Sequence, residues 1–248
     1  MKNILAIAGT ESRRIFVSPL AWTVLGVVQL ILGLVFVLTL LDFARLAGTS
    51  DGGYGVSDYV GGSVFGFAVI VLLLVMPLMT MRQFAEERKS GSLTLLFSAP
   101  VSLTEVVLGK FLGLMTFVIA MLALLAVMPF SLILSTHLDI GRILAGLFGM
   151  LMMMMAFGSA GLFVSSLTRE PTIAAVGSFG LLLLVWLIQM LSYNDAIPFG
   201  AVFGYLSLIG HFESMRRGIF NSADAIYYLL FTTLFLWLTV QRLDMERN

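Results

Sequence analysis

The sequence contains no cysteine, and only 11% of its 248 residues are charged. The absence of cysteine excludes disulfide bonds, thiolate metal sites and cysteine nucleophiles. Soluble domains carry about 25% charged residues, so this composition lies far outside that class. Basic and acidic residues are equal in number, 14 of each, and this balance gives no electrostatic footprint for nucleic-acid binding.

The chain also lacks the short motifs of several enzyme classes. It has no GxxxxGK[ST] loop, because the Gly-Lys pair at 109–110 is followed by Phe, so we expect no ATPase site of its own. The two histidines, His137 and His211, lie in polar segments without HExxH spacing, which leaves a membrane zinc protease unsupported. We therefore expect no catalytic, cofactor-binding or metal-binding residue in this chain.

Hydrophobic residues make up 59% of the sequence and gather in long uncharged runs. A helix needs about 20 apolar residues to cross a hydrocarbon core of about 30 Å. The sequence therefore predicts an all-α polytopic membrane protein in which residues 1–248 form a single transmembrane domain. The six predicted transmembrane helices cover residues 20–41, 60–81, 106–134, 143–167, 172–192 and 225–241.

Two shorter segments show other patterns. Residues 4–18 place most apolar side chains near one helical face, which predicts an amphipathic helix at the membrane interface before the first span. Residues 195–210 are apolar but short and broken by Pro198 and glycines, so we expect a re-entrant or interfacial helical segment before the last span. Ser102 and Glu105 match a capping box that would open the third span.

Lysine and arginine are distributed unequally over the predicted loops. With a cytoplasmic N-terminus and six crossings, ten of the 14 lie on the inner side and four on the outer side. Because basic loops favour the cytoplasm, both termini and residues 82–102 are predicted to be cytoplasmic. Counting residues 196–210 as a seventh crossing leaves the balance unchanged, but the length of this segment and its breakers argue against it.

Within the spans, the uncharged runs contain no ionisable residue when the third run is counted from Phe111. Intramembrane charges usually mark ion pathways, so their absence disfavours an ion-coupled transporter. Three pairs of glycines are separated by three residues, which is a weak indication of close helix contacts. They lie at positions 62 and 66, 109 and 113, and 200 and 204.

The polar interruption at residues 82–102 carries a recognisable set of motifs. It contains Glu-Arg-Lys-Ser-Gly-Ser at 87–92 and Pro-Val-Ser at 100–102, and Gly-Lys follows at 109–110. With the order of the spans around it, this set resembles the ABC type-2 permeases over nearly the whole chain. The subfamily that it most resembles is the gliding-motility-associated ABC permease, and the permease involved in maturing nitrous oxide reductase is a second candidate.

This resemblance implies an elbow helix at residues 4–18, a coupling helix between spans two and three, and an extracytoplasmic re-entrant hairpin at 195–210. It also implies a second permease copy or a homologous permease, and a dimer of separate cytoplasmic ABC ATPase subunits that hold ATP and Mg²⁺. A periplasmic or membrane accessory protein is a further expected partner. The expected location is the bacterial inner membrane.

The coupling segment has the physical properties that such a contact needs. A short helix can place leucine and phenylalanine side chains in a partner's groove, while charged residues form a polar rim and a glycine permits the turn. The residues expected to couple to the ATPase are Glu86, Glu87, Arg88, Lys89, Gly91, Ser92, Leu93, Leu95, Leu96 and Phe97.

We interpret the chain as the permease subunit of an ATP-driven transporter, with export as the expected direction. Two alternatives stay open. One is an intramembrane enzyme, such as a protease that uses Glu86 and Glu87, although a solvated ion-pair face is the preferred interpretation of these two residues. The other is a structural or mechanosignalling membrane protein that uses an ATPase but moves nothing. Uncharged spans favour a lipidic, amphipathic or polymeric cargo over a bare ion.

Overall fold

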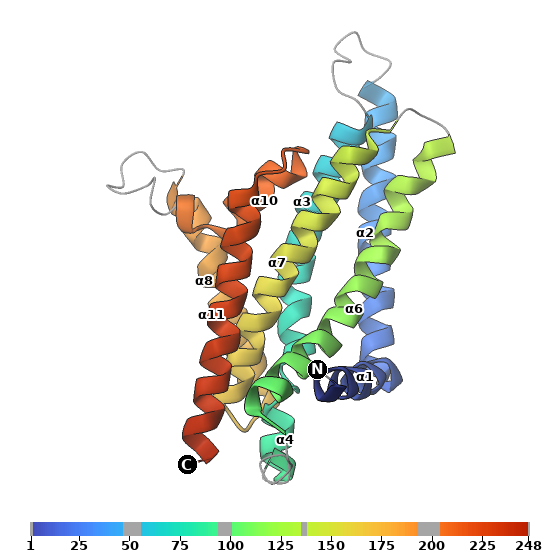
Figure 1. Cartoon of the computed structure of the whole chain (residues 1–248). Coiled ribbons are helices and arrows are strands. Elements are labelled where there is room, and N and C mark those ends of the chain that lie inside the picture. The colour runs from blue at the N-terminus through green and yellow to red at the C-terminus, as the bar shows by residue number, and fades with distance from the viewer. Residues whose placement is uncertain (1, 47–55, 94–100, 135–137, 193–203, 248) are drawn as a thin grey trace.

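The computed structural model describes residues 2–46, 56–93, 101–134, 138–192 and 204–247. Every element assigned in these ranges is a helix. Six of the helices are long and apolar enough to cross a membrane, and they run alongside one another in a single bundle (Figure 1). The prediction of an all-α polytopic membrane protein is confirmed.

The helices extend beyond most of the predicted apolar runs, because backbone hydrogen bonding continues into the polar residues at their ends. The candidate spans are α2, α3, α6, α7, α8 and α11. The bounds in chain order are α1 (Lys2–Val17), α2 (Pro19–Leu46), α3 (Val56–Thr80), α4 (Ala85–Ser90), α6 (Leu103–Ser131) with a 3₁₀ turn (Leu132–Leu134), α7 (Ile140–Leu167), α8 (Pro171–Ser192), α10 (Leu208–Arg216) and α11 (Ser222–Arg247).

The C-terminal part of the chain differs most from the sequence prediction. The last span was expected to end at residue 241, but α11 continues to Arg247, with Leu243 fully buried on its inner face. Most of the polar segment from 211 onward is also helical, because Ser207 caps α10 by accepting a hydrogen bond from the Gly210 N–H. Most of the predicted re-entrant segment, residues 195–203, lies outside the described residues.

Helix α1 lies across one end of the bundle, where the sequence predicts an interfacial helix (Figure 1). It packs closely on α6 at two glycines. A Cβ atom on Gly109 would lie 2.6 Å from Cγ2 of Ile7, and one on Gly113 would lie 2.7 Å from Cβ of Glu11. Only glycine permits this approach, so the Gly109-xxx-Gly113 contact predicted from the sequence is confirmed.

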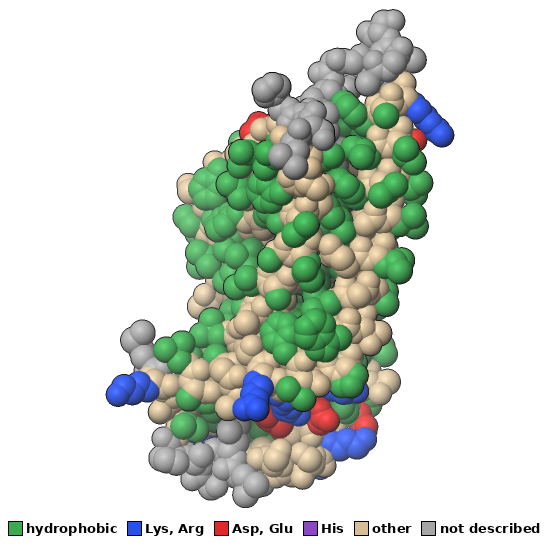
Figure 2. Space-filling model, turned by 90° about the vertical axis from the view of Figure 1, so that its right-hand side faces the viewer, with side chains coloured by type: hydrophobic (Ala, Val, Ile, Leu, Met, Phe, Trp, Pro, Cys, Tyr) green, Lys and Arg blue, Asp and Glu red, His purple; other side chains and the backbone are tan. Residues whose placement is uncertain are grey.

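Helix α7 is the central helix of the bundle. It packs against α3, α6, α8, α10 and α11, and much of its surface is buried, including Met150, Met153 and Phe157. The peripheral helices instead expose large apolar side chains such as Leu30, Leu184 and Leu230. Figure 2 shows hydrophobic side chains over the middle of the molecule and most charged side chains at the lower end. This arrangement suits a bundle surrounded by lipid.

Both termini lie at the same end of the bundle as α1 and α4, and α10 lies at the opposite end (Figure 1). An even number of crossings requires the termini to share a side, so the architecture agrees with the predicted topology. The capping box that opens α6 is also confirmed, since the Ser102 hydroxyl accepts from the Glu105 N–H and the Glu105 carboxylate accepts from the Ser102 N–H.

Candidate functional site

The short helix α4 follows a turn at residues 81–84 and ends at Gly91. Gly91 has a φ of 75° in the left-handed region, and its N–H donates to the carbonyl of Arg88. Glycine reaches this conformation at little cost. The turn at Gly91 follows α4, whereas the sequence interpretation placed it between the second span and the coupling helix. The hydroxyls of Ser90 and Ser92 both donate to the carbonyl of Glu87, so the C-terminal turn of α4 is held by its own side chains.

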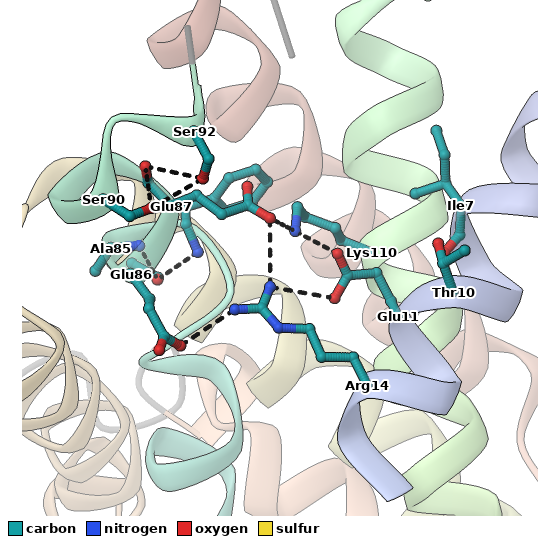
Figure 3. A network of polar contacts seen from close by, with 12 residues as sticks. Ile7, Thr10, Glu11, Arg14, Ala85, Glu86, Glu87, Ser90, Ser92 and Lys110 are labelled. Carbon is teal, nitrogen blue, oxygen red and sulfur yellow. Dashed lines mark hydrogen bonds and ion pairs between the residues drawn. The ribbon is translucent and has the colours of Figure 1, made fainter. Parts of the chain in front are cut away.

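Lys110 joins three helices at this end of the bundle (Figure 3). Its Nζ atom lies on α6 and donates to Glu11 Oε1 on α1 at 2.7 Å and to Glu87 Oε1 on α4 at 2.6 Å. The amine also lies 5.4 Å from the ring centroid of Phe84. The Lys110 side chain is only 2% exposed, so both ion pairs are shielded from water.

Arg14 adds a second cation to the same group of carboxylates (Figure 3). Its guanidinium lies 3.2 Å from Glu86 Oε2 and 3.4 Å from Glu87 Oε1, and the Glu11 carboxylate is 3.9 Å away. Glu87 therefore binds both cations, one on α1 and one on α6. We call this group, Glu11, Arg14, Glu86, Glu87 and Lys110, the elbow network.

The other two charged residues of α4 point toward the C-terminal half of the chain. Arg88 forms an ion pair with Glu246 on α11, and its side chain is only 6% exposed. Lys89 lies 2.9 Å from Glu170, which directly precedes α8, and this pair is open to solvent. Helix α4 thus forms ion pairs with residues on both sides of the bundle.

Ser165 attaches the start of α4 to the central helix α7. Its hydroxyl accepts from the N–H groups of Phe84 and Ala85 and donates to the carbonyl of Met81. These contacts satisfy backbone groups that the helix start leaves without an intrahelical partner. One turn earlier on α7, a Cβ atom on Gly161 would clash with the Thr80 side chain, so this side chain of α3 packs directly against the α7 backbone.

The structure corrects part of the sequence interpretation of this segment. A solvated ion-pair face was expected, but Glu87 and Arg88 are largely buried in contacts with their own chain. Leu93 is 4% exposed and packs in the chain's own core, so it is not available to a partner's groove. The predicted contact residues Leu95, Leu96 and Phe97 lie outside the described residues.

Three members of the elbow network were not predicted. Glu11 and Arg14 were expected to lie on an ordinary interfacial helix, and Lys110 was counted as a charge just outside the apolar run. One feature of the sequence could have indicated the network. Lys110 lies between Gly109 and Gly113, which permit close helix packing, and a charged residue at such a contact needs an oppositely charged partner on the other helix.

A second polar cluster lies at the opposite end of the bundle. His211 contacts Asp224 Oδ1 through Nδ1 at 2.6 Å and the Tyr205 carbonyl through Nε2 at 2.9 Å. On the same helix, burial acts to raise the pKa of Glu213, but hydrogen bonds and charges of Arg216 and Arg217 outweigh it and lower this pKa below its ordinary value. The His211–Asp224 contact holds α10 against α11, whereas the Glu213 pairs lie within α10 and its C-terminal end.

The acidic residues of the first cluster are engaged in ion pairs. Glu86 and Glu87 both pair with Arg14, whereas a catalytic carboxylate pair would need to face a substrate. Within the described ranges, no group of three or more histidine, cysteine, aspartate or glutamate residues is placed to hold a metal ion. The elbow network joins α1, α4 and α6 through ion pairs.

Comparison with known families agrees with this description of the fold. The model of the family described as "ABC-2 family transporter protein" matches residues 5–202. The matched region runs from α1 through α8 and includes α4 and the whole elbow network. A search of curated proteins finds no match to the chain.

Proposed function

Because the chain belongs to the ABC-2 transporter family, we propose that it is the permease subunit of an ATP-driven exporter in the bacterial inner membrane. Members of this family are membrane components of transporters and normally work with an ABC ATPase partner. ATP and Mg²⁺ would bind to a separate cytoplasmic ATPase dimer. The membrane part would contain two permeases, either two copies of this chain or this chain and a homologous one.

The topology within the membrane supports the same proposal. The end of the bundle that carries α1, α4 and both termini holds most of the basic residues, so it would face the cytoplasm. Helix α10 would then lie on the extracytoplasmic side, where an accessory protein would have access to it. The general likeness of the chain favours the gliding-motility-associated subfamily.

The observation that carries the proposal is the number of elements to which α4 is bonded. Glu87 reaches Arg14 on α1 and Lys110 on α6, Arg88 reaches α11, and Ser165 binds the start of α4 to α7. Charge-assisted hydrogen bonds are about twice as strong as neutral ones. A movement imposed on α4 would therefore be passed to helices on both sides of the bundle.

An ATPase subunit would supply that movement by docking on the tip of α4. The tip presents Gly91 and Ser92, which are exposed, and residues 94–97 follow directly. Of the predicted contact residues, Glu87, Arg88 and Leu93 would transmit force inside the permease, because they are buried. The exposed Ser92 and the residues after 93 would form the docking surface.

Co-purification of an ABC ATPase subunit with the permease from its native membranes tests the proposal. Ser92→Trp places a large side chain on the tip of α4 and should reduce the amount of ATPase recovered with the permease. Ser222→Trp is the matched control, because Ser222 is also an exposed serine but lies at the opposite end of the bundle. Equal recovery of ATPase with both variants would contradict docking at α4, and ATP hydrolysis by the isolated permease would contradict the whole proposal.

A further inference from the structure

A pocket of about 160 Å³ lies between α1, the start of α2, the end of α3 and α4. Its lining includes the polar side chains of Arg14, Arg82, Gln83 and Glu86. It also includes apolar side chains such as those of Leu20 and Met79. The pocket therefore combines polar and apolar groups at the elbow between a helix that lies across the bundle and the first span.

Two groups in this pocket lack a protein partner. Gln83 is 6% exposed, and its Oε1 atom is buried without a hydrogen-bond partner among the described residues. Buried acceptors of this kind are rare in proteins, because each lost hydrogen bond costs stability. Arg82 is exposed and forms no ion pair with any residue in the described ranges. The pocket thus offers one free acceptor and one free cationic donor.

Glu86 provides a second acceptor at the same place. Its carboxylate is about half exposed and bonds to Arg14 on one side only, at 3.2 Å. A ligand that satisfies all these groups needs a negative charge for Arg82 and N–H donors for Gln83 and Glu86. A ligand that also covers Leu20 and Met79 must continue into an apolar part.

We propose that this pocket binds the headgroup of a phospholipid that carries a phosphate and a primary ammonium group, as phosphatidylethanolamine does. The Arg82 guanidinium donates to the phosphate, in the way that arginine recognises phosphate elsewhere. The ammonium donates to Gln83 Oε1 and to the Glu86 carboxylate. The start of the acyl chains covers the apolar wall at the level where α1 meets the membrane interface.

The chemistry of the pocket separates this lipid from the other common ones. A choline headgroup has no N–H, so it leaves the Gln83 acceptor without a donor. A phosphatidylglycerol headgroup has hydroxyl donors but no cation for Glu86. Free phosphorylethanolamine has the same polar groups but nothing to cover Leu20 and Met79. This inference does not depend on docking of an ATPase, so either can fail without the other.

Native mass spectrometry of the delipidated permease tests the proposal with lipids of identical acyl chains. We expect the first phosphatidylethanolamine to bind about fivefold more tightly than phosphatidylcholine, the ratio that one hydrogen bond contributes. Gln83→Leu should reduce this preference, because Glu86 then remains as the acceptor for the ammonium, whereas Arg82→Gln should weaken the binding of both lipids by about fivefold because both carry the phosphate. Arg13→Gln is the control, since Arg13 is an exposed arginine on α1 that does not line the pocket.

Equal binding of the two lipids by the wild-type protein would overturn the proposal without the need for any variant. The proposal would also be overturned if the Arg82→Gln variant bound both lipids as tightly as the Arg13→Gln control does. Displacement of the lipid by an equal concentration of phosphorylethanolamine would show that the site takes a soluble ligand. Thermal unfolding of each variant in detergent checks that the differences in binding do not come from unfolding.

Discussion

The Nζ atom of Lys110 on α6 lies 2.6 Å from Oε1 of Glu87 on α4, and both side chains are largely buried. The same amine also binds Glu11 on α1, so one cation holds two carboxylates from different helices. Such a group is stable only while it is complete. A buried charge that loses its partner keeps the energetic cost of desolvation without the compensating ion pair. The ion pair therefore makes the positions of α1 and α4 depend on each other.

Removal of Lys110 should be strongly destabilising. Lys110→Met removes the buried cation between Glu11 and Glu87 and leaves them only the more exposed Arg14, and we expect a loss of about 3–5 kcal/mol in the free energy of unfolding. Denaturant unfolding in detergent measures this loss. Adding Glu87→Gln should restore part of it, since one of the two carboxylates that then share Arg14 is neutralised. The control Lys89→Met breaks an exposed pair and should cost less than about 1 kcal/mol; a cost similar to that of Lys110→Met would contradict the buried role of Lys110.

Alanine at Gly109 should separate α1 from α6. The added Cβ would lie 2.6 Å from Ile7, and overpacking of this kind costs about 1–3 kcal/mol. Gly180→Ala on α8 is the matched control, because no atom lies within 4 Å of its Cβ position. Alanine favours the helix by up to about 1 kcal/mol over glycine, so this control should be neutral or stabilising. Thermal unfolding of both variants shows the opposite signs, and the same sign for both would refute the close contact.

Substitution of Gly91 should affect coupling more than folding. No atom lies within 4 Å of its Cβ position, so Gly91→Val meets only the backbone cost of a φ of 75°, about 1–2 kcal/mol. We expect transport per ATP hydrolysed to fall in reconstituted vesicles while the melting temperature changes little. Gly91→Asn should keep most of the coupling, since asparagine tolerates this conformation better. Wild-type coupling in Gly91→Val would contradict the role of the turn.

Acid should weaken the ion pairs that Glu213 forms with Arg216 and Arg217 along α10. Arg216 and Arg217 hold the pKa of this carboxyl below its ordinary value of 4.5 despite partial burial. A lowered pKa stabilises the folded state above the unfolded pKa, and this contribution is lost as the pH falls through the folded pKa. Glu213→Gln should lower stability at neutral pH and flatten its decline in acid. Unfolding measured at several pH values tests this, and an unchanged acid decline in the variant would exclude Glu213 as its source.

Several features followed directly from the sequence because they depend on neighbours along the chain. The spans follow from the length of apolar runs, and the cap at Ser102 depends on residues only three positions apart. The Gly109-xxx-Gly113 contact was visible because small residues on one helical face permit close packing. The partner helix, α1, was not visible, since glycine spacing does not say which helix fills the gap.

The sequence by itself determined that this chain is a bundle of membrane helices and that its longest charged and polar interruption, residues 82–102, lies between two spans. Only the tertiary structure decided that Glu87 and Arg88 of that segment turn inward, toward residues up to 158 positions away. The physical reason is the distance along the sequence over which each interaction acts. Hydropathy and helix capping act over a few residues, whereas a buried ion pair or the pocket beside Gln83 exists only after separate helices have packed together.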